Sequence, residues 1–483
     1  MENTYQNPIL PGFYPDPSIC RVGDDYYMVT STFAYFPGVP IFHSKDLVHW
    51  VQIGNVLDRE EQLPLHHAGV SQGIFAPTIR YSDGIFYMIT TNVSGGGNFV
   101  VTATDPAGPW SQAHWIKNAP GIDPSLYFEK GKAYYQGTRE LENGRYYGDN
   151  EIYLQELCLE TWQLVGQRYT IYHTALKNAV WPESPHIYKI GDWYYLLHAE
   201  GGTSWDHACM IARSKVLTDY YQGWKSNPML THRHLGKKYP IQFVGHGDFV
   251  NTPNGDWHMV LLAVRKQHGA ENLGRETFMV PIVFEEGWPI ANYGIGLVEE
   301  YHPLPLPTKL SDKKPVSSWI HLRNPIKDNY IFHKNGNVSL KLAQSKIHEK
   351  QQVSFYCTRQ IHHNFEANVD IIHIDNKDGY AGLVLFQNEE FNYAIMVGNG
   401  KIIAMKGTEV LKEIVGTATN LKFIQNQQHV AMYYDGKILL DNLDGKILST
   451  SVAGGFVGTT IGMYAHGNDE GFATFSNFSY TGL

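Results

Sequence analysis

One hairpin-like unit is repeated five times along the N-terminal part of the chain. Each copy has an alternating apolar segment, a turn that contains Gly and an aromatic-rich return segment, which is the pattern of a β-hairpin. The copies read DPSICRVGDDYYMVTS, APTIRYSDGIFYMITT, DPSLYFEKGKAYYQGT, SPHIYKIGDWYYLLHA and GDFVNTPNGDWHMVLL, and they start at Asp16, Ala76, Asp123, Ser184 and Gly247. Self-similarity on this scale is the sequence mark of a repeat architecture.

A second mark shows how large each repeated unit is. Four copies are followed by a segment that closes on a tryptophan, at Trp50, Trp110, Trp162 and Trp224. Each unit therefore holds a hairpin and further strands, about four strands in all. Helical periodicity is nearly absent here. The sequence predicts an all-β fold with a five-bladed β-propeller over residues 1–300.

Acidic residues stand at or next to the start of three copies, as Asp16, Asp123 and Glu183, and His246 stands next to a fourth. Any one of them, taken alone, is most simply a turn residue that caps a backbone amide. In a propeller, however, the first strand of each blade lines the central channel, so these side chains should meet at one end. Because like charges at close range cost stability, their convergence predicts a functional site.

Two kinds of chemistry suit three carboxylates in a channel. A hard cation takes about six to eight oxygen ligands, and the dense acidic loops that supply them are missing from the sequence. Glycoside hydrolysis needs one protonated acid at the leaving oxygen and one ionised carboxylate on the opposite face of the sugar. A third carboxylate can keep the acid protonated by charge repulsion. The aromatic content of 13% suits stacking on sugars, as well as ordinary β-sheet packing.

Seven motifs occur in a fixed order: NPILPGFYPDPSI, STFAYFPGVPIFHSKDLVHW, GIDPSLYF, WPESPHIYK, AEGGTSW, GHGDF and NLGRETF. On these motifs the chain resembles glycoside hydrolase family 43, the five-bladed-propeller β-xylosidases and α-L-arabinofuranosidases. The resemblance implies an inverting mechanism with Asp16 as general base and Glu183 as general acid. It also implies that Asp123 raises the pKa of the acid and orients it. The two carboxyl groups of an inverting pair stand about 6.5–9.5 Å apart.

The same resemblance implies residues that bind the substrate. Arg275 in NLGRET should hold the hydroxyls of the terminal sugar, since a guanidinium fork suits two vicinal oxygens. Phe33 and Phe75 should wall the pocket for that sugar. Many relatives carry Trp where Phe75 stands, which leaves the width of the pocket open, and the family's usual Gly before PH is Ser184 here.

Three further residues have two interpretations each. Trp205 and His207 in GGTSWDH follow a predicted strand near the rim, where substrate contact competes with core packing. His246 resembles the family's axial histidine, which can ligate a calcium ion or a water cluster in the channel. One imidazole is an incomplete cage, so we expect that no cofactor is required and keep a calcium ion at His246 as the alternative.

The pattern changes after the fifth repeat. Prolines and charges in HPLPLPTKLSDKKPVSSW predict a linker over residues 301–319. From residue 320 to 483, segments such as EANVDIIHI, YAGLVLFQ and TTIGMYAHG alternate and are joined by Gly, Asn and Asp turns, which predicts an antiparallel β-sandwich. Family members of similar length carry a concanavalin-like sandwich here, with a loop able to close the pocket. Three roles of this domain remain open: it can brace the propeller, bind sugar weakly or form an oligomer interface.

Composition narrows the partners and the compartment. A net charge of −9 and a pI near 6.2 argue against nucleic acid and anionic membrane as partners. The four cysteines lie far apart without CxxC spacing, which argues against a zinc site or a disulfide framework. The N-terminal segment MENTYQNPIL resembles no signal peptide and no apolar run is long enough to span a bilayer, so we expect a cytoplasmic protein.

Together these features predict an exo-acting, inverting glycoside hydrolase. Its expected substrates are xylo-oligosaccharides and arabinoxylo-oligosaccharides, from which it removes terminal β-1,4-linked D-xylose, with side activity on α-L-arabinofuranosides. One alternative is an enzyme that is mainly an α-L-arabinofuranosidase. The other is a non-catalytic sugar-binding propeller, which needs no acid–base pair; the presence of Asp16, Asp123 and Glu183 at matched positions counts against it.

Overall fold

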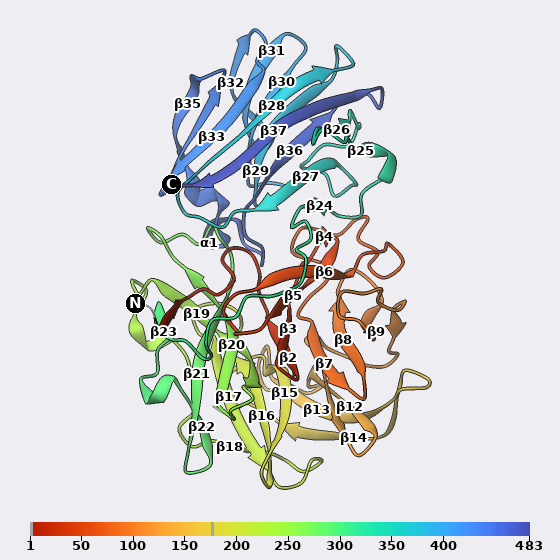
Figure 1. Ribbon diagram of the computed structural model, residues 1–483, viewed down its shortest axis with the longest axis vertical. Helices are drawn as coiled ribbons and strands as arrows, with labels where there is room; N and C mark the ends of the chain where they lie inside the picture. The colour runs from red at the N-terminus through yellow and green to blue at the C-terminus, as the bar shows by residue number, and fades with distance from the viewer. Residues whose placement is uncertain (1–2, 175–177) are drawn as a thin grey trace.

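The computed structural model describes residues 3–174 and 178–483, most of which lie in β-strands and the turns between them. A ring of five antiparallel sheets forms the lower part of the molecule, and two larger sheets packed face to face form the upper part (Figure 1). The predicted five-bladed propeller and the C-terminal β-sandwich are thus both confirmed. Short helices are rare: η1 (Arg233–Leu235), η2 (Asn292–Gly294), η3 (Lys327–Asn329), η4 (Gly445–Leu448) and α1 (Thr450–Ala453).

Each blade is a four-stranded sheet whose strands follow one another from the channel outward. The first two blades consist of β2 (Ser18–Val22), β3 (Asp25–Val29), β5 (Gly38–Ser44) and β6 (Val51–Leu57), and of β7 (Thr78–Ser82), β8 (Ile85–Asn92), β9 (Gly97–Ala103) and β10 (His114–Trp115). The third consists of β11 (Ser125–Glu129), β12 (Lys132–Glu140), β13 (Asn150–Cys158) and β14 (Gln163–Tyr172). The last two consist of β15 (Glu183–Ile190), β16 (Trp193–Glu200), β17 (Ala208–Ser214) and β18 (Gln222–Gly223), and of β19 (Ile241–Asn251), β20 (Trp257–Arg265), β21 (Glu276–Glu285) and β22 (Trp288–Ala291).

The five repeated hairpins of the sequence form the two inner strands of each blade. In the first blade, for example, Ser18 pairs with Val29 across the hairpin. The innermost strands β2, β7, β11, β15 and β19 each contact the innermost strands of the adjacent blades. Residues just before these strands therefore converge at one end of the channel, as the repeat predicts.

One buried carboxylate ties several blades together inside the channel. Asp248 of β19 accepts hydrogen bonds from the Ser18 hydroxyl at 2.6 Å and from the Ile19 amide at 3.0 Å, both in the first blade. Arg80 of the second blade approaches the same carboxylate at 2.8 Å, and the Tyr188 hydroxyl of the fourth blade donates to it. Burial opposes ionisation of Asp248, but Arg80 lowers its pKa well below the usual value. Asp248 thereby links the first, second, fourth and fifth blades.

The two ends of the propeller segment lie side by side. Strand β1 (Thr4–Gln6) pairs with β23 (Tyr301–Pro303), and Asn7 donates a hydrogen bond to the Met279 carbonyl of β21 at 2.9 Å. The predicted linker then runs along the first blade, where the Lys309 amide donates to Asp46 at 2.9 Å. The last propeller strand ends at Ala291 and the first sandwich strand begins at Ile320.

The sandwich consists of one sheet of eight strands and one of seven. The eight-stranded sheet holds, in spatial order, β32 (Glu409–Val415), β31 (Lys401–Lys406), β30 (Asn392–Gly398), β29 (Tyr380–Phe386), β36 (Thr460–His466), β27 (Ser354–Arg359), β24 (Ile320–Leu322) and β4 (Tyr35–Phe36). The seven-stranded sheet holds β25 (Tyr330–Phe332), β26 (Val338–Lys341), β37 (Phe472–Gly482), β28 (Phe365–Ile374), β33 (Asn420–Asn426), β34 (His429–Tyr434) and β35 (Lys437–Asp444). Buried aliphatic and aromatic side chains fill the space between the two sheets.

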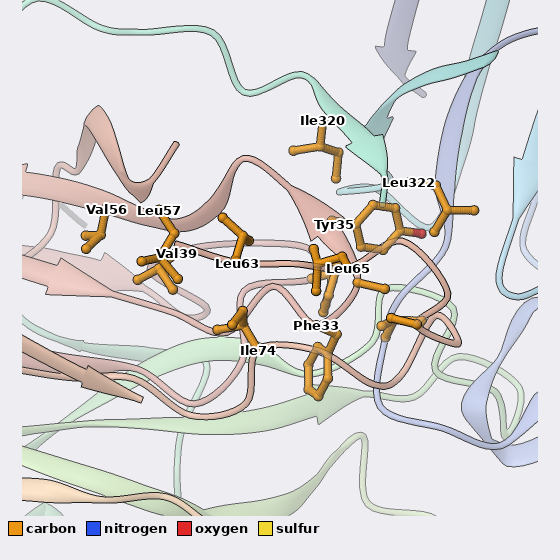
Figure 2. Packing of buried hydrophobic residues seen from close by; sticks show 14 of the residues in the cluster. Phe33, Tyr35, Val39, Val56, Leu57, Leu63, Leu65, Ile74, Ile320 and Leu322 are labelled. Atoms are coloured by element: carbon orange, nitrogen blue, oxygen red, sulfur yellow. The ribbon is translucent and has the colours of Figure 1, made fainter. Parts of the chain in front are cut away.

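The two domains share both a strand and a core. Strand β4 belongs by sequence to the propeller, yet Tyr35 pairs with Leu322 at the edge of the sandwich sheet. Figure 2 shows Tyr35 close to Ile320 and Leu322, in an apolar cluster that continues into the first blade through Leu63 and other residues. Continuous apolar burial of this kind holds two domains in one relative position.

Two features of the described residues concern membranes and cysteine chemistry. None of their helices is long and apolar enough to cross a membrane. Cys20, Cys158, Cys209 and Cys357 are all free thiols.

Candidate active site

A cavity of about 550 Å³ opens at the end of the channel where the innermost strands begin. Asp16, Asp123 and Glu183 all line it, together with His246 and Arg275. The structure thus brings together the three acids that the repeat placed at equivalent positions. They come from the first, third and fourth blades.

An unusual backbone conformation accompanies these residues. Asp16, Asp123, Ser184 and His246 have φ angles of 55°, 52°, 53° and 52°, in the left-handed region. Residues with a Cβ seldom adopt it, and such strain clusters at functional sites. The same kink therefore occurs at or just before the start of the innermost strand in three blades, and within β19 in the fifth. In the fourth blade Ser184 takes the kink, and Glu183 precedes it.

Asp16 is held as a carboxylate. Its Oδ1 lies 2.8 Å from Nη1 of Arg275, its Oδ2 lies 3.4 Å from Nη2, and the Ser31 hydroxyl donates to it. Burial opposes ionisation, but Arg275, His246 and Ser31 together lower the pKa of Asp16 below its ordinary value. A buried carboxylate that stays ionised can accept a proton from water, which is what a general base does.

The other two acids favour the protonated form. Burial raises the pKa of Glu183 to about 7, the charge of Asp16 adds to this, and Arg275 opposes it. Burial also raises the pKa of Asp123 well above its usual value, with further contributions from Glu183 and Asp16. Because neighbouring carboxylates resist ionising together, this pair retains a proton near neutral pH. The pKa of Glu183 is thus raised by burial and by Asp16, while Glu183 in turn raises the pKa of Asp123. The expected effect of Asp123 on Glu183 stays a prediction.

Arg275 connects the acids to the pocket wall. Besides Asp16, its Nη1 donates to the Thr203 hydroxyl at 3.2 Å and its Nη2 to the Phe456 carbonyl at 3.4 Å. Its buried Nε finds no acceptor among the described residues. A planar guanidinium with an unused donor next to the acids is suited to bind sugar hydroxyls.

Three phenylalanines form an aromatic wall. The rings of Phe33 and Phe75 meet edge to face with centroids 5.3 Å apart. Phe456 stacks on Phe33 at 5.9 Å and meets Phe75 edge to face at 5.8 Å. Phe456 belongs to the sandwich domain, in the Gly-rich segment that follows α1, and α1 lies at the junction of the two domains (Figure 1). Aromatic faces at this spacing suit the apolar face of one sugar ring.

Trp181 lines the cavity although the sequence analysis did not single it out. It stands two residues before Glu183, and its backbone also has a positive φ of 51°. Its ring packs against Gly202, where an added Cβ would lie 2.7 Å from the ring. The aromatic residue in WPES was the available signal. Ile122, Thr203 and Phe243 also line the cavity and carried no such signal.

Trp205 and His207 do not form part of the cavity wall, since neither is among the described residues that line it. The Trp205 ring is half-buried and lies 5.9 Å from Nζ of Lys237. His207 is buried, its Nδ1 bonds to the Phe243 carbonyl at 2.9 Å, and burial lowers its pKa to about 3. His207 therefore supports Phe243, which faces the cavity.

His246 offers a poor cage for calcium. Its Nδ1 lies 3.7 Å from Asp16 and 4.0 Å from Asp123. Among the described residues, no group of three or more His, Cys, Asp or Glu side chains is arranged to hold a metal ion. Calcium requires about six to eight oxygen ligands, which one imidazole beside two engaged carboxyls does not supply. The residues present do not fit a protein-held calcium ion.

A second cavity of about 970 Å³ meets the first at Glu183. The two share Ile122, Trp181 and Glu183, and the rest of the second cavity is lined by the third blade and the loops beside it. Asn150 lies in its wall with 9% exposure, and its Oδ1 has no partner among the described residues. No sequence pattern indicated this cavity, because most of its residues lie outside the repeated hairpins, in the later strands of the third blade and the loops beside them.

Comparisons with known proteins agree with this geometry. The family described as Glycosyl hydrolases family 43 matches residues 5–289, and the Beta xylosidase C-terminal Concanavalin A-like domain matches residues 311–481. A xylosidase/arabinosidase from Butyrivibrio fibrisolvens is 44% identical, over 98% of this chain and 98% of its own. A non-reducing end α-L-arabinofuranosidase from Bacteroides ovatus is 36% identical, over 99% of this chain and 94% of its own.

Solved structures show the same arrangement of both domains. A family 43 protein of the Bacteroides ovatus xyloglucan locus has a TM-score of 0.90 at 35% identity, covering 99% of this chain and 100% of its own. A xylan β-1,4-xylosidase from Bacillus halodurans has a TM-score of 0.89 at 31% identity, with the same coverage of 99% and 100%. With its propeller, its three acids and these matches over both domains, the chain belongs to glycosyl hydrolases family 43.

Proposed function

We propose that the chain is an exo-acting, inverting glycosidase that releases terminal β-1,4-linked D-xylose from xylo-oligosaccharides and arabinoxylo-oligosaccharides. Activity on α-L-arabinofuranosides accompanies it. One observation carries this conclusion: a single cavity holds Asp16 with a lowered pKa and Glu183 with a raised one. Carboxyl groups whose environments push their pKa values apart are the acid and base of a glycosidase. The named activities of the relatives support the choice of pentose.

The chemistry follows from these two states. Asp16 takes a proton from a water molecule as the water oxygen attacks the anomeric carbon of the terminal sugar. The bond from that carbon to the glycosidic oxygen breaks, and Glu183 gives its proton to the departing oxygen. The product is the free sugar with inverted anomeric configuration. Asp123 keeps Glu183 protonated until this step, and Arg275 orients Asp16.

The shape of the cavity supports exo action. Phe33, Phe75 and Phe456 line the cavity on the side of Arg275, and we assign this aromatic wall to the end of the pocket that holds the terminal sugar. The leaving group must lie beside Glu183, since this residue protonates the leaving oxygen. The second cavity begins at Glu183 and takes the remainder of the oligosaccharide.

The second cavity has the polarity that sugar hydroxyls require. Arg139 and Arg168 line it, and Asn150 presents an unused acceptor. Arg139 bonds to Glu151, whereas Arg168 donates to the side chain of Gln155 at 2.9 Å. A buried acceptor without a partner costs free energy until a ligand donates to it. We assign Asn150 to the leaving-group sugar.

Cofactor, compartment and partners form part of the same proposal. No cofactor is required, because the acid, the base and the cationic group are all supplied by side chains. A cytoplasmic enzyme would trim imported short chains, which suits a closed terminal pocket. The partner is the oligosaccharide, with neither nucleic acid nor membrane, and assembly into a homo-oligomer stays open.

The decisive test is hydrolysis of p-nitrophenyl β-D-xylopyranoside and p-nitrophenyl α-L-arabinofuranoside by wild type and Asp16→Ala. We expect turnover by the wild type and a loss of about 10³-fold or more in the variant, which corresponds to about 4 kcal/mol of transition-state stabilisation. Proton NMR of the first-formed product should show the inverted anomer. Absence of turnover of either substrate by folded wild type would leave the sugar-binding alternative.

A preference for arabinofuranosides is the second candidate. Its support is the similarity over nearly the whole chain to the Bacteroides ovatus α-L-arabinofuranosidase, together with Phe75 in the pocket wall. The ratio of kcat/KM for the two aryl glycosides separates the candidates. A ratio that favours the arabinofuranoside by more than about tenfold, or 1.4 kcal/mol, would make that activity the principal one.

A further inference from the structure

Glu271 is a buried acid in the cavity wall that the mechanism above does not use. It lies between β20 and β21 of the propeller and is 1% exposed. Its Oε1 accepts a hydrogen bond from the Thr450 hydroxyl at 2.8 Å, and its Oε2 accepts one from the Ser451 hydroxyl at 2.8 Å. Lys266 approaches Oε2 at 3.5 Å. Both carboxylate oxygens are therefore engaged, which leaves Glu271 unsuited to act on the substrate directly.

The hydroxyls that Glu271 holds belong to the sandwich. Thr450 and Ser451 form the first turn of α1, and the chain continues from α1 through Gly455 to Phe456. Phe456 is the sandwich residue of the aromatic wall. Glu271 thus fixes the start of the segment whose end forms part of the sugar pocket.

Ser71 holds the same segment at its other end. Its hydroxyl accepts a hydrogen bond from the Phe456 amide at 2.9 Å, and it comes from the loop between the first two blades. Arg275 donates to the Phe456 carbonyl. The peptide groups on both sides of the Phe456 Cα are therefore bonded to the propeller, although the Phe456 side chain remains 36% exposed.

Close backbone packing accompanies these bonds. A Cβ on Gly274 would lie 2.7 Å from the backbone of Gly458, so the two loops touch at glycines. The Thr459 amide donates to the Asn272 carbonyl at 2.9 Å, and Asn272 donates to the Gly445 carbonyl at 2.7 Å. The propeller loop and residues 445–459 of the sandwich form one interlocked surface.

We infer, given the proposed hydrolase function, that Glu271 and Ser71 are positioning residues that hold Phe456 against the terminal sugar. The sandwich domain then contributes to substrate affinity through this segment, and its docking completes the pocket. A merely structural role for Glu271 would affect the stability of the fold and leave KM unchanged. The two roles therefore give different results in kinetics.

The first set of variants tests whether the segment sets affinity. Glu271→Ala should raise KM for the aryl xyloside by about tenfold, the size expected from losing one to two net hydrogen bonds, with little change in kcat. Glu271→Gln should restore most of the affinity, since an amide can pair with two hydroxyls that either donate or accept. Ser71→Ala and the double variant Thr450→Val/Ser451→Ala should raise KM in the same way. These variants also test the inference if Glu271→Ala does not fold.

A double-mutant cycle tests whether the effect passes through Phe456. If it does, Glu271→Ala should add little to KM once Phe456→Ala is present. An equal rise of KM in both backgrounds would overturn the inference, as would an unchanged KM in folded Glu271→Ala. Asn324→Ala is the matched control. Asn324 joins the domains by bonds to Leu63 and Leu65 and does not line the pocket, so its variant should lower Tm and leave KM unchanged.

A measurement without substrate separates this inference from the proposed function. Hydrogen exchange of residues 449–459 should accelerate in Glu271→Ala and Ser71→Ala relative to wild type and Asn324→Ala. If exchange accelerates in these variants but the wild type hydrolyses neither aryl glycoside, the docking role is supported and the proposed function is wrong. Unchanged exchange in both variants would overturn the docking role itself.

Discussion

The carboxylate of Asp16 faces the guanidinium of Arg275 in a buried two-pronged contact, with 2.8 Å from Oδ1 to Nη1. This contact divides the work among three acids that lie in one cavity. The acid next to the cation stays ionised, while Glu183, where burial outweighs the cation, keeps its proton. Base and acid are therefore distinguished by their surroundings: Arg275, His246 and Ser31 favour the charged form of Asp16, whereas burial dominates at Glu183.

The pH dependence of kcat/KM should reflect this division. Catalysis needs Asp16 ionised and Glu183 protonated, so activity should fall as the pH rises through about 7, the pKa of Glu183. The acidic limb should lie below the ordinary carboxyl range, because the pKa of Asp16 is lowered. Initial rates at low substrate between pH 4 and 9 measure the alkaline limb, and no acidic limb should appear in this range. An alkaline limb above pH 9 would contradict the assignment of Glu183.

Replacing Asp123 should move the alkaline limb. Asp123→Asn removes the carboxyl group with which Glu183 shares a proton, so the pair's last proton should be lost at lower pH. We expect the limb to shift toward acid and kcat at neutral pH to fall at least tenfold, about 1.4 kcal/mol. A pH profile identical to that of the wild type would show that Asp123 acts by orientation alone.

Glu183→Gln should affect substrates according to their leaving groups. A p-nitrophenolate departs without protonation, whereas a sugar alkoxide does not. We therefore expect a loss of about 10³-fold or more on xylobiose and a much smaller loss on the aryl xyloside, which corresponds to about 4 kcal/mol on the former. Comparison of kcat/KM on both substrates measures it. Equal losses would remove Glu183 from the role of general acid.

Asn150 should matter only when a sugar occupies the second cavity. Asn150→Ala removes the unpartnered acceptor in the wall, and we expect kcat/KM on xylotriose to fall about fivefold to tenfold, a loss of about 1–1.4 kcal/mol. The aryl xyloside, whose leaving group makes few hydrogen bonds, should be turned over as by the wild type. Equal effects on both substrates would place the leaving group elsewhere.

The Arg80–Asp248 pair in the channel should be important for stability. Asp248→Asn leaves the buried guanidinium of Arg80 without its carboxylate, and breaking such a pair costs about 3–5 kcal/mol. Thermal unfolding should show a clear fall in Tm. Glu413→Gln, which breaks the exposed pair with Lys401, is the control and should leave Tm unchanged. A similar Tm for both variants would show that the channel pair does not hold the blades together.

The sequence was sufficient to predict that the three acids converge, because equivalent positions of a repeat lie close together in a propeller. Asp16, Asp123 and Glu183 lie far apart in sequence, but each stands at or next to the start of a repeat copy, so the propeller brings them together. Arg275, Phe33 and Phe75 followed from the resemblance of their motifs, and all three line the cavity. Local patterns and one symmetry rule were enough for this half of the site.

The rest of the site depends on how two domains pack, which no local pattern records. Phe456 and Glu271 lie in loops whose partners are more than a hundred residues away, so their pairing follows from the docked surfaces. The two-residue strand β4 is too short for an alternating pattern to reveal it. Trp205 was expected at the rim because it follows a strand of the fourth blade. Its neighbours Thr203 and Ser204 do line the cavity, whereas Trp205 does not, and its ring lies 5.9 Å from Nζ of Lys237.

Strand β4 has a consequence for anyone who would divide this chain. Because Tyr35 and Phe36 supply the last rung of a sheet that otherwise belongs to the C-terminal half, a fragment starting near residue 311 would carry β24 with its hydrogen-bonding groups bare. Bare strand edges recruit other strands, so the severed half should self-associate, while the N-terminal half would lose a wall of its catalytic chamber. Either half expressed alone is thus expected to fold poorly, and the two halves form one folding unit.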